Sequence, residues 1–457
     1  MAARLQSVGE IQRAEDIYRS VLAEQPEQPD ALHLLGVVMF QRGNHAAAID
    51  FIGQAVARQP GIAMYHNNLG KVYRAMDRFE DALVHFNRAL ELDSNMIEAL
   101  YNSGEVLRWL RKSGDALEML DRAIALHPGY SVALLCKGEI MQKEGRVDEA
   151  LNCYRQAIAS APDKAGIYFG VGQALTALGR RDEAIKHYQT AVALRPSWAA
   201  PHLELADMYK KDGKLNEAAD CCHRVLSFQP DNVFARHMLY ALEGAPIERA
   251  SAEYVRQLFD GYASSFDQNL LEKLDYRTPA MLAELMRNYL AGKDGEWHIL
   301  DIGCGTGLMG PELRGLGKRL VGVDLSAKML QKAQERGVYN ELLEGDLVER
   351  MVQFPSASFD VGVAADVFVY VGNLAPVFEQ CRRILREQGV LAFSIERLSD
   401  DTCDFTLELT QRFKHSCGYI DRLCSRFGFI VVHREFAHIR KQGRDPVEGC
   451  LYLLRKA

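Results

Sequence analysis

The hydrophobic pattern in the first half of this chain repeats every 34 residues. Most periods hold two alanines with a large residue between them, as in Ala82, Phe86 and Ala89. A glycine earlier in the period and a proline at its end keep the same register: Gly36, Gly70, Gly104, Gly138 and Gly172, and Pro26, Pro60, Pro128, Pro162, Pro196 and Pro230. Small residues let helices approach closely, and proline ends a helix. The pattern therefore predicts about six helix pairs between residues 29 and 230, with partial copies at each end.

This period and residue pattern resemble those of tetratricopeptide repeats. The resemblance implies an all-α solenoid over residues 1–245, whose concave groove docks a protein or a peptide. In related repeats, groove asparagines grip peptide backbone, and Asn68 and Asn102 take that position here. The charged groove residues expected around them are Lys71, Arg74 and Arg108. The alternative is a solvated polar face without a docking role.

The second half has a different pattern, which begins where glycine and proline interrupt the chain at 243–247. Two helices are expected over 251–293. Short apolar runs then alternate with helical patterns, and these candidate strands cover 298–302, 319–323, 340–344, 359–364, 390–395, 429–434 and 450–454. Such alternation is typical of a doubly wound α/β sheet. The sequence thus predicts a second domain over 246–457, with its core at 297–457.

Three glycines follow the first candidate strand of this domain. Gly303, Gly305 and Gly307 form a G-x-G-x-G turn, in which backbone can touch a ligand. The dinucleotide fingerprint would place its last glycine at position 308, which is Leu308. Asp324 ends the second strand at the distance expected of a ribose-binding carboxylate. These residues predict a nucleotide-like cofactor other than a nicotinamide dinucleotide.

The stretch 300–307 resembles motif I of class I S-adenosylmethionine-dependent methyltransferases. The resemblance implies a Rossmann-like sheet of seven mostly parallel strands, whose last strand is antiparallel, and S-adenosylmethionine as the cofactor. The whole chain is similar to bacterial tetratricopeptide-repeat methyltransferases.

The resemblance also assigns a part of the cofactor to each residue at the carboxyl edge of the sheet. Asp301 would face the amino-acid part, and Asp324 would accept both ribose hydroxyls. Leu325 would pack on the adenine, while Asp346 and the backbone of Leu347 would bind its amino group and a ring nitrogen. The other expected contacts are Gly303, Cys304, Gly305, Gly307 and Ala365. The alternative for Asp301 and Asp346 is a helix or turn cap.

Aromatic residues and one histidine are candidates for the reaction itself. The segment 259–267 resembles a methyltransferase lid, which implies that Tyr254 or Tyr262 covers the cationic sulfonium. Ordinary packing of this helix on the sheet is the alternative. His415 is the candidate general base because its ordinary pKa lies near neutrality, and Tyr370 is the candidate for orienting the acceptor. The alternative for His415 is a surface loop.

Composition narrows the function classes. The net charge of −7 argues against nucleic-acid binding by bulk charge. The ten cysteines form no C-x-x-C pair, so we expect no metal and a reduced, cytoplasmic protein. No stretch approaches transmembrane length, so no membrane partner is expected. Metal-free methyl transfer to oxygen, nitrogen or sulfur remains. A small-molecule methyltransferase whose repeats serve assembly, and a non-catalytic cofactor-binding scaffold, are the alternatives.

Overall fold

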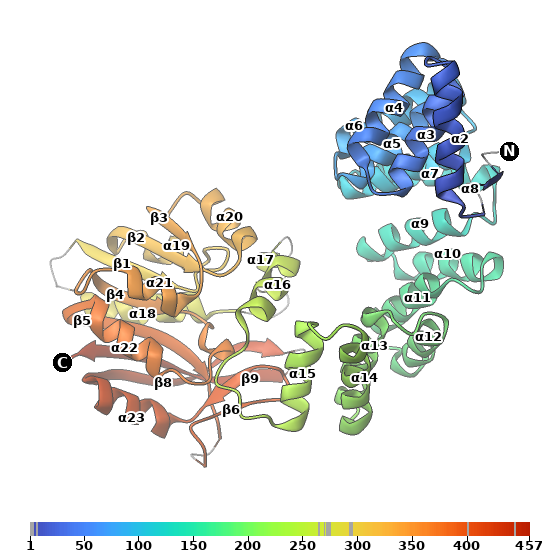
Figure 1. Cartoon of the computed structure of the whole chain (residues 1–457). Helices are drawn as coiled ribbons and strands as arrows, with labels where there is room; N and C mark the ends of the chain where they lie inside the picture. Colours follow the sequence, from blue (N-terminus) through green and yellow to red (C-terminus); the bar gives the residue numbers. More distant parts are fainter. Residues whose placement is uncertain are drawn as a thin grey trace. The chain divides into compact units, whose positions relative to one another are not determined.

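The computed structural model describes residues 4–5, 8–263, 266–268, 270, 276–291, 296–399, 402–442 and 445–457 (Figure 1). Its contacts divide the chain into two compact units, Met1–Pro201 and His202–Ala457. Each unit is described by itself.

The first unit is built from antiparallel helix pairs. Its helices are α2 (Ile11–Glu24), α3 (Pro29–Gln41), α4 (His45–Arg58), α5 (Ala63–Ala75), α6 (Phe79–Leu92), α7 (Ile97–Trp109), α8 (Ser113–Leu126), α9 (Ser131–Lys143), α10 (Val147–Ser160), α11 (Ala165–Ala177) and α12 (Arg181–Leu194). The repeated small residues explain the pairing: a Cβ added to Gly70 of α5 would lie 2.6 Å from the ring of Phe86 in α6. The predicted repeat solenoid is confirmed.

The second unit begins with the last repeat and a closing helix. Helix α13 (Ala199–Lys211) enters it and is followed by α14 (Leu215–Phe228) and α15 (Val233–Glu243). Gly244 ends α15 in the left-handed conformation, with φ of 64°. The predicted domain boundary at 245/246 thus lies inside the second compact unit rather than at its edge.

A seven-stranded sheet forms the centre of the second unit. Its strands are β1 (Trp297–Ile302), β2 (Gly317–Asp324), β3 (Glu341–Glu344), β4 (Phe359–Ala364), β5 (Leu385–Glu396), β8 (Phe429–Gln442) and β9 (Asp445–Lys456). They lie in the order β3-β2-β1-β4-β5-β9-β8. The first five pair in parallel, and β9 is antiparallel to β5 and β8. The predicted mostly parallel sheet of seven strands is confirmed.

The sheet separates two hydrophobic cores. Helices α21 (Leu347–Gln353), α22 (Ala375–Ile384) and α23 (Cys417–Phe427) contribute to one core, and α18 (Thr278–Leu290) and α19 (Gly310–Leu313) contribute to the other. The unit also contains α16 (Ala252–Tyr262), α17 (Phe266–Gln268) and α20 (Ala327–Glu335). In β5, Leu391 and Phe393 enter one core while Val390 and Ala392 enter the other. Both faces of β5 are therefore buried from Val390 onward, which explains why this part of the strand is mainly apolar.

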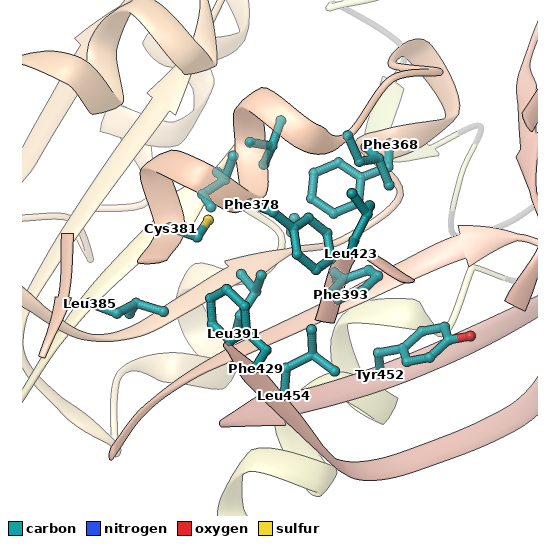
Figure 2. Close-up of a cluster of buried hydrophobic side chains, with 14 of the residues drawn as sticks. Phe368, Phe378, Cys381, Leu385, Leu391, Phe393, Leu423, Phe429, Tyr452 and Leu454 are labelled. Carbon is teal, nitrogen blue, oxygen red and sulfur yellow. The ribbon is translucent and has the colours of Figure 1, made fainter. Parts of the chain in front are cut away.

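Figure 2 shows the core on the side of α22 and α23, where Phe378 and Leu423 pack against Phe393 and Tyr452. This packing fixes β4 and β5, whose carboxyl ends carry site residues. Outside the main sheet lies a hairpin that the sequence did not predict, formed by β6 (Phe405–Leu407) and β7 (Phe413–His415).

Candidate functional site

A cavity of about 350 Å³ opens at the carboxyl ends of the parallel strands. This edge is where open α/β sheets bind ligands. The volume lies within the range of small-molecule sites, roughly 300–1,000 Å³. The predicted residues that line the cavity are Asp301, Gly303, Cys304, Gly305, Asp324, Leu325, Asp346, Leu347, Ala365 and Tyr370. The structure thus brings together residues from five separate segments of the sequence.

The glycine turn places backbone directly in the cavity wall. The amides of Gly303 and Cys304 donate to the Val323 carbonyl at 2.8 and 3.0 Å, which ties the turn to β2. All three turn glycines have positive φ, with values of 71°, 55° and 79°. An added Cβ at Gly305 would meet no protein atom within 4 Å. Gly307 has another role, because its Cβ would lie 2.9 Å from the Tyr339 ring; it permits packing and is not a lining residue.

Asp324 joins the turn to β2 and keeps capacity for a ligand. Its Oδ2 accepts from the Gly305 amide and its Oδ1 from the Ser326 amide, both at 2.9 Å. Burial raises the pKa of Asp324, while these backbone amides oppose the rise. A carboxylate has about four lone-pair sites. Asp324 can therefore accept further hydrogen bonds from a diol that enters the cavity.

Asp301 is a buried acid with a pKa near neutrality. Its side chain is 1% exposed, and its Oδ2 accepts a hydrogen bond of 2.6 Å from the Tyr339 hydroxyl. Burial raises the pKa of Asp301 to about 7, and the neighbouring Asp324 adds to the rise, whereas Tyr339 lowers it. A cationic ligand in the cavity would favour the ionised form.

Asp346 combines the two roles that the sequence left open. Its Oδ1 caps helix α21 by accepting from the amides of Val348 and Glu349 at 3.0 and 3.3 Å. Its Oδ2 lies 3.2 Å from Nη1 of Arg249, which also lines the cavity. Asp346 is thus both a helix cap and a lining residue.

The predicted lid tyrosines do not line the cavity. The Tyr254 side chain is buried against α15, with its ring centroid 3.9 Å from that of His237. Tyr262 is 52% exposed. Phe259 and Phe266 line the cavity instead. Tyr254 faces α15 because the face of α16 that carries it packs on that helix.

His415 is also placed away from the cavity. It is fully buried, and its Nε2 lies 2.9 and 3.0 Å from the carbonyls of Val371 and Gly372. Burial lowers its pKa to about 4, so at neutral pH it is a neutral donor that ties β7 to the segment after η2 (Phe368–Tyr370). The structure corrects the prediction of a general base: His415 is structural. Tyr370, by contrast, lines the cavity, and Phe259 contacts its ring edge-on at 5.4 Å.

A charged cluster lies at the cavity, and the pairing of its members was not predicted from the sequence. Asp366 and Arg412 line the cavity. Arg440 donates to both Asp366 oxygens at 3.0 and 3.1 Å and also to Glu396. Arg412 is held less closely, at 3.5 Å from Glu396 and 3.7 Å from Asp366. Asp366 adopts a positive φ of 58°. Nothing in the local sequence links these residues, because they come from four distant segments.

Most of the groove residues predicted in the repeats already have polar partners within the repeats. Asn68 contacts His33 at 2.8 Å, and Lys71 bonds Glu98 at 2.8 Å. Arg74 contacts Glu105 and Asn102. Asn102 is 3% exposed and donates to Asn67 at 2.9 Å. Arg108 lies 3.7 Å from Glu139 and differs from the others, because it lines a hollow of about 540 Å³ with Phe169, Arg195 and Trp198.

In the part of the chain that the structure describes, no three histidine, cysteine or acidic side chains are arranged to hold a metal ion. No helix within the same residues is long and apolar enough to cross a membrane.

Comparisons with known proteins match the repeats and the α/β domain to different families. A family model described as a methyltransferase domain matches residues 300–393, and tetratricopeptide-repeat models match 5–71, 63–96, 137–201 and 172–232. The chain is 36% identical over 113 residues to methyltransferase-like protein 27 of Homo sapiens, which covers 24% of this chain and 46% of that protein. It is 30% identical over 172 residues to a ubiquinone biosynthesis O-methyltransferase of Albidiferax ferrireducens, which covers 35% of this chain and 68% of the relative.

A malonyl-[acyl-carrier protein] O-methyltransferase of Yersinia pestis is 32% identical over 96 residues, with 21% of this chain and 35% of the relative covered. The chain thus spans less than half the length of several curated relatives that it matches. Among solved structures, MamA protein is 26% identical and matches with a TM-score of 0.34, over 38% of this chain and 94% of that one.

Proposed function

We propose that this chain is an S-adenosylmethionine-dependent methyltransferase, since it belongs to the methyltransferase-domain family. It also carries tetratricopeptide repeats. The observation that carries the proposal is the pairing of Gly305 with Asp324. This pair presents open backbone and a buried carboxylate with spare acceptor capacity in one cavity wall. That combination suits a ligand with a ribose diol.

The other lining residues also fit this cofactor. S-adenosylmethionine supplies a methyl group on a cationic sulfonium when it is bound. Asp301 would hold the ammonium group of the amino-acid part, and Leu325 would pack on the adenine. Asp346 and Leu347 would meet the adenine edge. The proposed transfer is metal-free.

The remaining wall is proposed to receive the methyl acceptor. It is largely apolar and includes Val255, Phe259 and Val377, so it excludes water and favours an acceptor with an apolar body. Burial raises the pKa of Tyr370, so its hydroxyl stays protonated and can donate to an acceptor oxygen. Arg412 can donate to the same group. Oxygen is the favoured acceptor atom because several relatives are O-methyltransferases; nitrogen or sulfur acceptors remain candidates.

For the repeats, we propose docking of a protein or peptide substrate in the cytoplasm. The hollow around Arg108, Phe169, Arg195 and Trp198 supports this proposal better than the paired residues near Asn68 do. Arg195 lies over the Trp198 ring at 5.6 Å, so a carboxylate and an aromatic group of a peptide would both find contacts there. A small-molecule methyltransferase whose repeats serve assembly is the second candidate, favoured by the limited cavity volume.

Titration calorimetry with S-adenosylmethionine tests the proposed cofactor. Asp324→Ala should weaken binding at least about 100-fold, because hydrogen bonds to a charged group contribute about 1.5–3 kcal/mol each. Asp421→Ala is the matched control, since Asp421 is half-exposed and pairs with Arg434; it should bind like the wild type. Absence of binding to the wild-type chain would refute the proposal.

Labelled-methyl transfer into a native lysate, resolved by mass spectrometry, tests the acceptor. Label in a protein, lost in a full chain that carries Arg108→Ala and Arg195→Ala together, would support docking on the repeats. Label confined to small molecules, unchanged by the double variant, would favour the second candidate.

A further inference from the structure

We propose that helix α15, the closing helix of the repeats, supports the wall that receives the methyl acceptor, and that His237 is a positioning residue for Arg412. This inference rests on the proposed function, since it concerns the acceptor side of the same cavity.

His237 joins α15 directly to the β6–β7 hairpin. Its side chain is 3% exposed, and its Nε2 donates to the backbone carbonyl of Gln411 at 3.1 Å. Burial lowers the pKa of His237, although the bond to Gln411 opposes this effect. The ring is therefore neutral at neutral pH. With a carbonyl as partner, Nε2 must carry the proton. The histidine side of this bond is buried, and the bond as a whole is partly buried.

The residue that accepts this bond lies in a strained turn. Gln411 has φ of 65°, in the left-handed region that costs a residue with a side chain about 1–2 kcal/mol. Its amide donates to the Glu408 carbonyl at 2.8 Å, and the Glu408 amide donates to the Arg412 carbonyl at 2.9 Å. These two bonds close the turn, and the contact from His237 holds it from outside. The next residue, Arg412, lines the cavity.

The orientation of Arg412 depends on this turn because its own side-chain contacts are long. Arg440 makes close hydrogen bonds with the same two carboxylates, Asp366 and Glu396. Arg412 approaches them only to 3.7 and 3.5 Å, and its guanidinium lies 5.8 Å from the centre of the Tyr370 ring. Arg412 therefore has donors to offer to an acceptor. Its direction is set by the backbone that His237 anchors.

Apolar packing provides a second link between α15 and the hairpin. Ala241 of α15 forms one buried cluster with Leu407 of β6 and Phe413 of β7. Tyr240 and Phe405 pack against this cluster. Since both hairpin strands contact α15, a displacement of this helix would carry the hairpin, and Arg412 with it. The last helix of the repeat array is thus built into the acceptor side of the cavity.

Three variants of the full chain test this inference. His237→Phe keeps a ring against Tyr254 but removes the donor, and His237→Gln restores an amide donor. His187→Phe is the matched control, because His187 is a partly buried histidine that stacks on Tyr168 in the first unit. The readouts are hydrogen exchange of residues 405–415, calorimetry with S-adenosylmethionine and labelled-methyl transfer into lysate.

His237→Phe should speed exchange of the hairpin on the order of fivefold, the effect of one lost hydrogen bond. It should lower methyl transfer several-fold, with cofactor affinity within about twofold of the wild type. His237→Gln should recover most of both losses. Unchanged hairpin exchange in His237→Phe, or an equal change in His187→Phe, would overturn the inference. A wild-type chain that fails to bind S-adenosylmethionine would instead overturn the proposed function, and the exchange result would still report on the anchoring of the hairpin.

Discussion

The repeats and the cavity use the same polar residue types in opposite ways. In the groove near Asn68, polar side chains pair with one another, as Asn102 does with Asn67 and Lys71 with Glu98. At the cavity, Asp324 accepts hydrogen bonds from the backbone amides of Gly305 and Ser326 and also lines the cavity wall. A polar residue is therefore a strong candidate for ligand binding when its local partners leave acceptor or donor capacity unused.

The largest effect is expected from a comparison of two N-terminal deletions. Removal of residues 1–201 takes away the first compact unit and should leave affinity for S-adenosylmethionine within about threefold. Removal of 1–245 also takes away α15 and exposes Leu407 and Phe413. It should abolish methyl transfer and lower the melting temperature by roughly 10 °C, the effect of exposing two buried side chains. Equal melting temperatures of the two truncated chains would contradict the supporting role of α15.

A matched pair of glycine substitutions separates the two regions further. Gly307 has a positive φ of 79°, and an added Cβ there would lie 2.9 Å from the Tyr339 ring. Gly307→Val should therefore distort the turn and abolish cofactor binding. Gly138→Val would overpack the Tyr154 ring between α9 and α10 and should destabilise the first unit by about 1–3 kcal/mol. Cofactor affinity of Gly138→Val should stay unchanged in calorimetry. Loss of binding in both variants would show that the two units are energetically coupled.

Cofactor affinity should depend on pH through Asp301. Because its pKa is raised to about 7, most of the carboxyl is protonated at pH 6 and ionised at pH 8. Affinity for the cationic cofactor should therefore rise about tenfold between these values. The free protein should behave oppositely: its folded state holds the proton more tightly than the unfolded chain, so this contribution to stability falls as pH rises toward 7.

Calorimetry at pH 6, 7 and 8 measures this dependence. Asp301→Asn should bind more weakly than the wild type at pH 8 and should show a flat profile. A wild-type profile as flat as that of the variant would mean that Asp301 does not contact the cationic part of the ligand.

The sequence predicted those features whose cause is local or periodic. The repeats could be predicted because glycines pack against large residues at a fixed distance along the chain, as Gly70 packs against Phe86. The turn at Gly303 to Gly307 and the terminal acid Asp324 are likewise neighbours in sequence or in adjacent strands. Family comparisons confirm the repeats and the methyltransferase domain that these patterns indicated.

The sequence could not predict which side chains already have partners. His415 was a candidate base by residue type, yet the carbonyls of Val371 and Gly372 bond it inside the protein. Tyr254 was a candidate lid residue, but α15 covers it with His237. The contacts of Arg412 could not be predicted, because Asp366 and Glu396 come from other segments of the sequence. In each case the deciding contact is long-range, which no local pattern records.

The smallest effect is expected for a substitution in the groove, Arg74→Ala. It tests whether residues that are paired within the repeats can still bind a partner. Arg74 is 29% exposed and pairs with Glu105, so Arg74→Ala should destabilise the first unit by only about 0.5–1 kcal/mol. Methyl labelling of lysate proteins should stay near that of Arg88→Ala, a control that removes an exposed pair with Glu91. A several-fold loss of protein labelling in Arg74→Ala, without a change in thermal unfolding, would mean that the partner displaces Glu105 and binds Arg74. The groove would then resemble the cavity, and internal pairing would no longer separate structural from ligand-binding residues in this chain.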